Sequence, residues 1–175
     1  MPPHHGPVRR LHGLVRDLSI PRHILDEMIA HARELAPHEC CGMLAGKDGR
    51  ATRHYKVKNV VATKEEGVKA LFDEAKITTL EQMTSEERAD IAFWMDTKDM
   101  FAAQKDMRAN SVELLASYHS HPISPARPSP TDIKALALYP DICHIIISLQ
   151  DPKAPVANAF RIANGTATPV PYHIL

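Results

Sequence analysis

Residues 118–132 read Tyr-His-Ser-His-Pro-Ile-Ser-Pro-Ala-Arg-Pro-Ser-Pro-Thr-Asp and combine two histidines with an aspartate. The apolar run at residues 112–118 predicts a short buried strand whose end carries His119 and His121. Because residues i and i+2 of a strand point to the same face, both imidazoles are expected on one side of a sheet. Two imidazoles and the Asp132 carboxylate make three of the four ligands of a catalytic zinc ion, and the fourth position is left to water.

The aspartate lies at a predicted helix start. Residues 129–132, Ser-Pro-Thr-Asp, place Ser129 at the N-cap and a proline in the first turn. Asp132 is then held on a rigid first turn instead of a loop. An ordinary capping box gives the same pattern, since an acid at this position also suits the helix dipole. The helix start alone therefore does not identify a metal ligand, and the combination with the two histidines carries the hypothesis.

The spacing His-x-His, seven residues, Ser-x-x-Asp resembles the signature of the JAMM (MPN+) zinc metalloproteases. That family also has an upstream glutamate, and residues 37–46, Pro-His-Glu-Cys-Cys-Gly-Met-Leu-Ala-Gly, resemble its first helix-to-strand junction. The resemblance extends from about Ile20 to Ile162 and is greatest to stand-alone prokaryotic members. It implies one α/β domain with a mixed central β-sheet flanked by helices, the MPN/JAMM fold, in a layout like that of cytidine deaminases.

The resemblance implies one catalytic Zn²⁺ ion with three protein ligands, His119, His121 and Asp132. It implies Glu39 as the general base, although on spacing alone a glutamate beside a strand is a solvated end residue. The Ser129 hydroxyl is implied as the group that stabilises the oxyanion. Because one hydroxyl cannot easily cap a helix and bind an oxyanion together, we expect the Ser129 backbone and Pro130 to set the helix entry while the side chain faces the metal.

Family members hydrolyse isopeptide or peptide bonds after the Gly-Gly tail of ubiquitin-like or sulfur-carrier proteins, so such a protein is the implied substrate and partner. An extended tail can pair with the edge of a sheet. Two alternatives stay open, a non-catalytic scaffold of the same fold and another zinc hydrolase. Zinc deaminases are disfavoured because the sequence contains no Cys-x-x-Cys.

The composition is that of one globular domain with balanced charge. The 175 residues include 21 Lys plus Arg and 21 Asp plus Glu, so there is no basic field to hold nucleic acid. Three cysteines, two of them adjacent, do not make a disulfide framework and suit a reducing compartment. The apolar runs are too short for a membrane span, and no signal-like core begins the chain. We therefore expect a cytoplasmic protein with no membrane partner; an oligomer is possible.

Residues 1–18, rich in Pro, Gly, His and Arg, are expected to form a flexible arm with an edge strand near residues 14–18. Residues 19–175 are expected to form the JAMM/MPN+ metalloprotease domain. A charged, helix-prone insertion at about 62–90 is longer than the connection in compact prokaryotic relatives. Its one or two short helices are expected either to lie over the approach to the site or to pack elsewhere.

Hydrophobic periodicity predicts the other elements. Helices are predicted at residues 21–35, 99–110 and 130–138. Strands are predicted at residues 41–45, 52–61, 91–94, 143–149, 156–162 and 168–172. His144, in the most β-prone run of the chain, is expected to be a core or strand-end residue, and Ser120 is expected to point away from the ligand face.

Overall fold

A computed structural model of the chain describes residues 17–61 and 93–175. The predicted insertion at 62–90 and nearly all of the predicted arm lie outside these ranges, so the division of the chain into arm, domain and insertion stays a prediction. Within the described ranges, no helix combines the length and the apolar character needed to cross a membrane. The three cysteines are free and buried.

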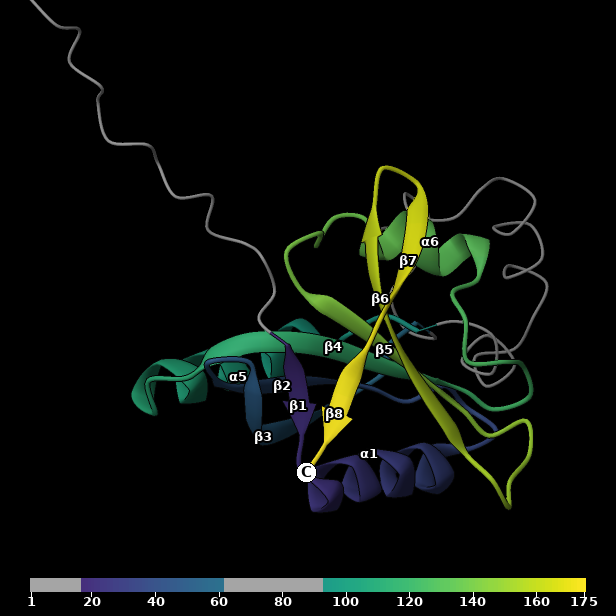
Figure 1. Cartoon of the computed structure of the whole chain (residues 1–175), viewed down its shortest axis with the longest axis horizontal. Coiled ribbons are helices and arrows are strands. Elements are labelled where there is room, and N and C mark those ends of the chain that lie inside the picture. The colour runs from purple at the N-terminus through teal and green to yellow at the C-terminus, as the bar shows by residue number, and fades with distance from the viewer. Residues whose placement is uncertain (1–16, 62–92) are drawn as a thin grey trace, which may run out of the picture.

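A mixed eight-stranded sheet forms the centre of the described part of the molecule (Figure 1). Its spatial order is β7-β6-β5-β4-β2-β3-β1-β8. The central strand β4 pairs with β2 antiparallel and with β5 parallel. This arrangement confirms the predicted mixed α/β sheet. The strands are β1 (Leu18–Ile20), β2 (Cys41–Lys47), β3 (Arg50–Val57), β4 (Glu113–His121), β5 (Cys143–Ser148), β6 (Val156–Ala163), β7 (Thr166–Val170) and β8 (Tyr172–Ile174).

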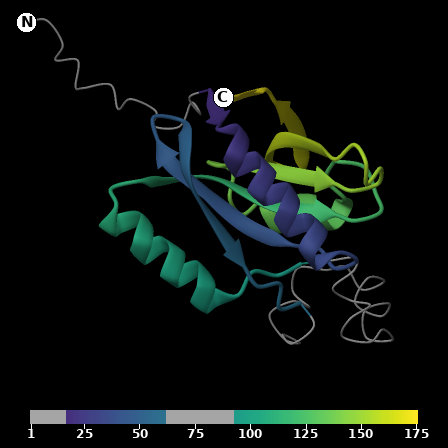
Figure 2. The ribbon, with the colours of Figure 1, turned by 90° about the horizontal axis from the view of Figure 1, so that it is seen from below.

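Helices cover both faces of this sheet. On one face, α1 (Arg22–Leu35) buries Met28 and Ala32 in the larger hydrophobic core. On the other face, α5 (Thr97–Ala109) packs Ala103 and Met107 against β2, and α6 (Pro130–Leu136) packs near β6. Figure 2 shows α1 and α5 on opposite sides of β2 and β3. Side chains that alternate along β4 therefore enter two different layers.

Tyr118 holds the α1 face of β4 in place. Its ring is fully buried, and its hydroxyl lies 2.7 Å from Nδ1 of His31 and 2.6 Å from Nε2 of His54. Gly42 is the partner of Tyr118 in the β2–β4 ladder. A Cβ added at Gly42 would overlap the tyrosine ring. The Tyr118 side chain, which directly precedes the first ligand histidine, can therefore occupy this buried position because its neighbour on β2 is a glycine.

Several predicted elements differ from the structure. Residues 93–94 are not a strand, and only Met95 forms a bridge, with Asn59; residues 91–92 lie outside the described ranges. The strand predicted at 168–172 is two strands, β7 and β8, which lie at opposite edges of the sheet. Pro171 separates them, because proline has no amide hydrogen to give to a ladder.

Element ends also shift. The strand predicted at 52–61 is β3, which begins at Arg50 and ends at Val57. Asp48 and Gly49, with φ of 53° and 82°, make a two-residue turn from β2, so both strands run closer to the turn than expected. The helix predicted to reach residue 138 ends at Leu136. The strand expected near 14–18 begins at Leu18, and it is not an edge strand, because β1 pairs with β3 on one side and with β8 on the other.

We expect Gly42→Ala to lower the free energy of unfolding by about 1–3 kcal/mol, because the added methyl group overlaps the buried Tyr118 ring. Urea unfolding measures this change. The double variant Gly42→Ala/Tyr118→Leu should lose less stability than the sum of the two single variants, since the smaller side chain removes the overlap. Strict additivity would contradict the packing constraint.

Burial, with smaller contributions from Lys56 and His54, lowers the pKa of His31 to about 4. Between pH 6.5 and 4 the unfolded chain therefore binds a proton at His31 that the folded chain does not. Stability should fall as pH falls through this window, by up to about 1.4 kcal/mol per pH unit from this residue. Urea unfolding at pH 7 and pH 5 measures this change. The free energy of unfolding should decrease more between these pH values for the parent protein than for His31→Asn. Equal decreases in the two proteins would contradict this role of His31.

Candidate metal centre

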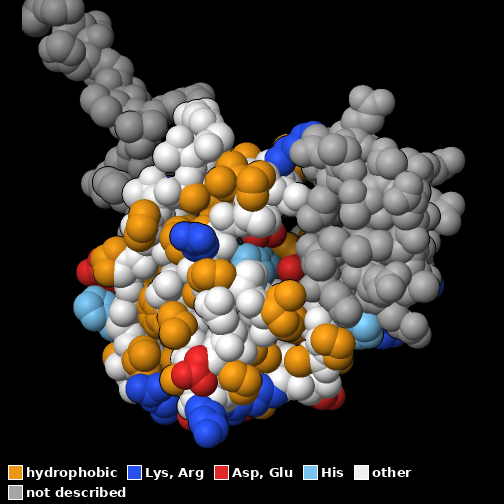
Figure 3. Space-filling view, turned by 90° about the vertical axis from the view of Figure 1, so that its right-hand side faces the viewer, with side chains coloured by type: hydrophobic (Ala, Val, Ile, Leu, Met, Phe, Trp, Pro, Cys, Tyr) orange, Lys and Arg blue, Asp and Glu red, His pale blue; other side chains and the backbone are white. Residues whose placement is uncertain are grey.

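Three predicted site residues meet on the α5 and α6 side of the sheet. The Nε2 atoms of His119 and His121 are 3.1 Å apart. Oδ2 of Asp132 lies 3.1 Å from Nε2 of His121 and 3.4 Å from Nε2 of His119. All three side chains are buried. On one face of the molecule, histidine and acidic side chains meet among hydrophobic ones (Figure 3).

Local structure explains why these atoms converge. His119 and His121 are both within β4, two residues apart, so their rings share one face. Asp132 is the third residue of α6, which begins at Pro130. The ladder between β4 and β5 continues to the pair His121 and Ser148, so the backbone stays fixed up to the last histidine.

The spacing of the three atoms fits a tetrahedral metal ion. Zinc–nitrogen bonds of about 2.0–2.1 Å place tetrahedral ligand atoms about 3.3 Å apart. The observed separations are 3.1 and 3.4 Å. Nδ1 of His121 lies 2.9 Å from the Pro125 carbonyl oxygen, which can only accept, so Nδ1 carries the proton and Nε2 offers its lone pair to a metal. Two imidazoles and a carboxylate are donors that zinc accepts.

The charges of the cluster favour a cation. Burial alone would raise the pKa of Asp132, but the His119 and His121 imidazoles hold it well below its usual range. Burial also opposes a charge on His121, whereas its hydrogen bond and attraction to the Asp132 carboxylate raise the pKa of this histidine. A metal and a proton therefore compete for Nε2 of His121, and metal binding weakens as the pH falls.

Glu39 is buried just before β2. Cys41 is opposite His119 in the antiparallel ladder. The same register carried two residues further puts Glu39 opposite His121, on the face that holds the ligands. The structure thus places the predicted base on the segment beside the cluster.

Backbone contacts hold this segment against β4. The amide of Cys40 donates to Oγ of Ser120 at 2.8 Å, and the amide of Ser120 donates to the Cys40 carbonyl at 3.0 Å. Nδ2 of Asn59 donates to the Glu39 carbonyl at 3.0 Å. Ser120 therefore points away from the ligand face and has a structural role, as predicted.

The Ser129 hydroxyl caps α6, so the expectation that it stays out of the cap is wrong. The Asp132 amide donates to Oγ of Ser129 at 3.1 Å, and the Ser129 amide donates to Oδ2 of Asp132 at 2.8 Å. The cap uses only a lone pair of the hydroxyl, so its proton is left to donate to another acceptor. One hydroxyl can therefore cap the helix and also donate a second hydrogen bond.

His144 shares the ligand face but is bound elsewhere. Its Nδ1 lies 2.7 Å from Oγ of Ser117, and its Nε2 lies 3.0 Å from the Tyr139 carbonyl. Burial lowers its pKa to about 4, so the ring is neutral at pH 7. Both nitrogens are occupied, which confirms the prediction of a core residue.

Two contacts of the cluster have little signal in the sequence. Phe93 stacks on the His119 ring with centroids 4.3 Å apart and planes 22° apart. The Pro125 carbonyl orients His121, and any residue in that position offers a carbonyl. The sequence shows an aromatic residue at position 93, but its pattern predicts a strand there and not a contact with His119.

Most of the chain matches a known protein family. A model of prokaryotic homologs of the JAB domain matches residues 21–163. CysO-cysteine peptidase of Mycobacterium tuberculosis (strain ATCC 25618 / H37Rv) is 29% identical over 165 residues, which are 93% of this chain and 94% of that protein. A probable TtuB-protein conjugate cleaving protease of Thermus thermophilus is 33% identical over 123 residues, 70% of this chain and 64% of that protein.

Solved structures share the fold. A protein from Desulfitobacterium hafniense, solved in solution, is 31% identical with a TM-score of 0.66, and the match covers 90% of this chain and 91% of that one. A JAB1/MPN domain protein from Archaeoglobus fulgidus is 14% identical with a TM-score of 0.53, over 91% and 98% of the two chains, a likeness of fold alone. The chain therefore belongs to the prokaryotic branch of the JAB/JAMM (MPN) domain family and is a homologue of CysO-cysteine peptidase.

Proposed function

We propose that the protein is a zinc-dependent peptidase that hydrolyses the bond after the C-terminal Gly-Gly tail of a ubiquitin-like or sulfur-carrier protein. The convergence of two imidazole nitrogens and a carboxylate oxygen within 3.1–3.4 Å carries this proposal. The relatives named for CysO-cysteine and for TtuB–protein conjugates support a small carrier protein as partner. Free, buried cysteines support a reducing, cytoplasmic setting.

In this proposal one Zn²⁺ ion is held by His119, His121 and Asp132. A zinc ion in this position supplies Lewis acidity and lowers the pKa of a bound water towards about 7. The Asp132 carboxylate is ionised and the His121 tautomer is set by the Pro125 carbonyl, so the chain presents its donor atoms without rearrangement.

Glu39 is the proton carrier. Its carboxylate takes a proton from the attacking water and passes that proton to the nitrogen of the leaving amine. The C–N bond breaks, the hydroxyl of the water stays on the glycine carbonyl carbon, and Glu39 returns to its ionised form. A non-catalytic scaffold would have no need of a carboxylate buried opposite the ligand strand.

Ser129 stabilises the negative charge that develops on the carbonyl oxygen. Its Oγ accepts from the Asp132 amide, so the cap fixes the oxygen while the hydroxyl proton points to the substrate. The Phe93 ring covers one face of His119 and keeps water from that side of the ligand. The cap therefore orients the catalytic hydroxyl instead of competing with it.

We expect the purified protein to contain one equivalent of zinc and Asp132→Ala to lose it, with affinity lowered at least about tenfold, because one of three protein ligands is removed. Metal analysis by mass spectrometry after dialysis measures the content. Asp141→Ala, an exposed aspartate of the loop before β5, is the matched control and should keep its metal. Full zinc content in Asp132→Ala would contradict the ligand assignment.

Glu39→Gln should lower turnover by about 10²–10⁴-fold while zinc content stays at the parent level, because the amide cannot accept the proton. The assay incubates the zinc-loaded enzyme with Gly-Gly-tailed proteins extended at the C-terminus and detects the shortened product by mass spectrometry. Glu113→Gln, exposed at the start of β4, is the control. Undiminished cleavage by Glu39→Gln would rule out this carboxylate as the base.

A further inference from the structure

The peptide group between Glu39 and Cys40 is held from both sides by side chains of neighbouring segments. Its carbonyl accepts from Nδ2 of Asn59 at 3.0 Å, and its amide donates to Oγ of Ser120 at 2.8 Å. Glu39 lies outside both ladders of β2, whose first paired residue is Cys41. These two side-chain bonds therefore fix the backbone from which the Glu39 carboxylate projects, where the ladders no longer do so.

Asn59 reaches this carbonyl because it continues the line of β3. Val57 is opposite Cys41 in the β2–β3 ladder, so the same register carried two residues further puts Asn59 opposite Glu39. At this position the side-chain amide makes the bond across to the neighbouring segment. Asn59 is half-buried, which limits the competition of water for that bond. A change at Asn59 therefore acts directly on the backbone of the proposed base.

The oxygen of the same amide group holds a second segment. Oδ1 of Asn59 accepts from the amide of Trp94 at 3.0 Å and from the amide of Val61 at 3.2 Å. With a carbonyl at one end and two N–H groups at the other, the orientation of this side chain is fixed. Phe93, the residue before Trp94, stacks on the ring of His119. One side chain thus connects the backbone of the proposed base with the backbone that carries a ring against a proposed zinc ligand.

The two ligand histidines differ in how their rings are oriented. The Pro125 carbonyl faces Nδ1 of His121, which is the usual arrangement for a histidine that binds a metal. Nδ1 of His119 is buried and has no hydrogen-bond partner among the residues that the structure describes. The Phe93 ring, whose plane is 22° from that of His119, is therefore the described contact that restricts the rotation of this ligand.

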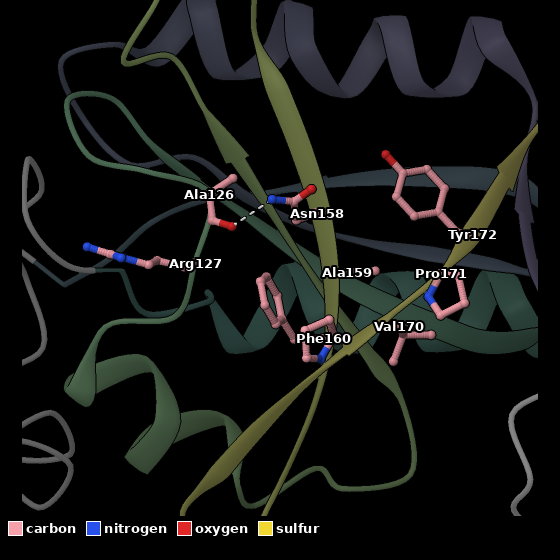
Figure 4. A pocket seen from close by; sticks show the side chains of 9 residues that line it. Ala126, Arg127, Asn158, Ala159, Phe160, Val170, Pro171 and Tyr172 are labelled. Carbon is pink, nitrogen blue, oxygen red and sulfur yellow. Dashed lines mark hydrogen bonds between the residues drawn. The ribbon is translucent and has the colours of Figure 1, made fainter.

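The loop that orients His121 is attached to the sheet by the same kind of bond. Nδ2 of Asn158, on β6, donates to the Ala126 carbonyl at 3.1 Å (Figure 4). Ala126 follows Pro125, whose carbonyl faces His121. Each ligand histidine is therefore oriented by a segment to which an asparagine side chain is bonded. On the His119 side the same asparagine also holds the base.

Resting on the proposed function, we propose that Asn59 is a positioning residue that keeps the base Glu39 and the ligand His119 in one arrangement. Its Nδ2 group fixes the backbone of Glu39. Its Oδ1 atom fixes Trp94 and thereby the Phe93 ring. A displacement of about 1 Å at a reacting group can lower a rate about 10²-fold, so hydrogen bonds to the backbone behind that group are enough to control turnover.

Substitutions can separate the two effects. In Asn59→Asp a carboxylate oxygen still accepts from the Trp94 amide, but no N–H group is left to donate to the Glu39 carbonyl. Asn59→Ala removes both bonds, and Asn59→Gln keeps both groups on a longer side chain. Phe93→Leu removes the stacked ring and leaves Asn59 in place. The matched control is Asn110→Asp at the exposed end of α5, where Nδ2 donates to the Asp106 carbonyl at 2.8 Å.

We expect Asn59→Asp to lower kcat about ten- to hundredfold while KM and zinc affinity stay at the parent level, because only the base loses a bond. Asn59→Ala should lower kcat similarly and should also weaken zinc binding about tenfold, as should Phe93→Leu. Asn59→Gln should restore part of both losses. Adding Asn59→Ala to Phe93→Leu should weaken zinc binding no further, because the amide acts on His119 through the ring. Asn110→Asp should match the parent.

The measurements use the full chain. Competition with a chelator gives the zinc affinity, and cleavage of C-terminally extended Gly-Gly-tailed proteins by the zinc-loaded enzyme gives kcat and KM. Hydrogen exchange of the Trp94 amide measures the Oδ1 bond without any substrate. The parent and Asn59→Asp should protect this amide, and Asn59→Ala should not.

The outcomes that overturn the proposal differ for its two parts. Parent kcat in Asn59→Asp, or a loss that falls on KM alone, would overturn the role towards Glu39. Parent zinc affinity in Asn59→Ala, or additive losses in the double variant with Phe93→Leu, would overturn the role towards His119. Absence of cleavage by the parent would count against the proposed function, and zinc affinity and hydrogen exchange would still decide the contact with His119.

Discussion

The register of β4 between β2 and β5 is the constraint on which the site depends. A shift of one residue would turn His119 and His121 towards α1 and bring Tyr118 to the ligand face. Contacts on the α1 side oppose such a shift. The Tyr118 ring packs over Gly42, and its hydroxyl lies within hydrogen-bond distance of two histidine rings. Packing on one face of the sheet thereby keeps the two ligand histidines on the other face.

The entry of α6 is tied to the metal centre through one oxygen. Oδ2 of Asp132 accepts the Ser129 amide and also faces both imidazoles. The helix cap and the proposed zinc site therefore share an atom, and a carboxylate that serves the cap is already aimed at the metal. The Ser129 hydroxyl completes the arrangement, because the cap leaves its proton for the substrate.

The parts of the fold that local patterns predicted are those whose partners are close in sequence. Helix α1, strand β5 and the start of α6 after Ser129 follow from periodicity and from the position of proline in the first turn. The failures involve distant partners. Pro171 lets one apolar run supply both edges of the sheet, and Phe93 stacks on His119 instead of entering a strand. Neither the edge that a strand joins nor the ring that an aromatic residue covers is encoded in local spacing.

The sequence by itself determined the donor atoms: two imidazoles on one strand face, an aspartate on a helix entry and a glutamate before a strand. The positions of the imidazoles and the aspartate depend on periods of two and 3.6 residues, which are local properties of the chain, whereas the glutamate was assigned only through the resemblance to the JAMM metalloproteases. Only the tertiary structure decided that the donor atoms of the two histidines and the aspartate lie within 3.4 Å of one another, that Glu39 comes beside β4 and that the Asn59 side chain joins Glu39 to Trp94. Those outcomes depend on pairing between segments far apart in the chain, because ladder register and layer packing are settled by the whole domain at once.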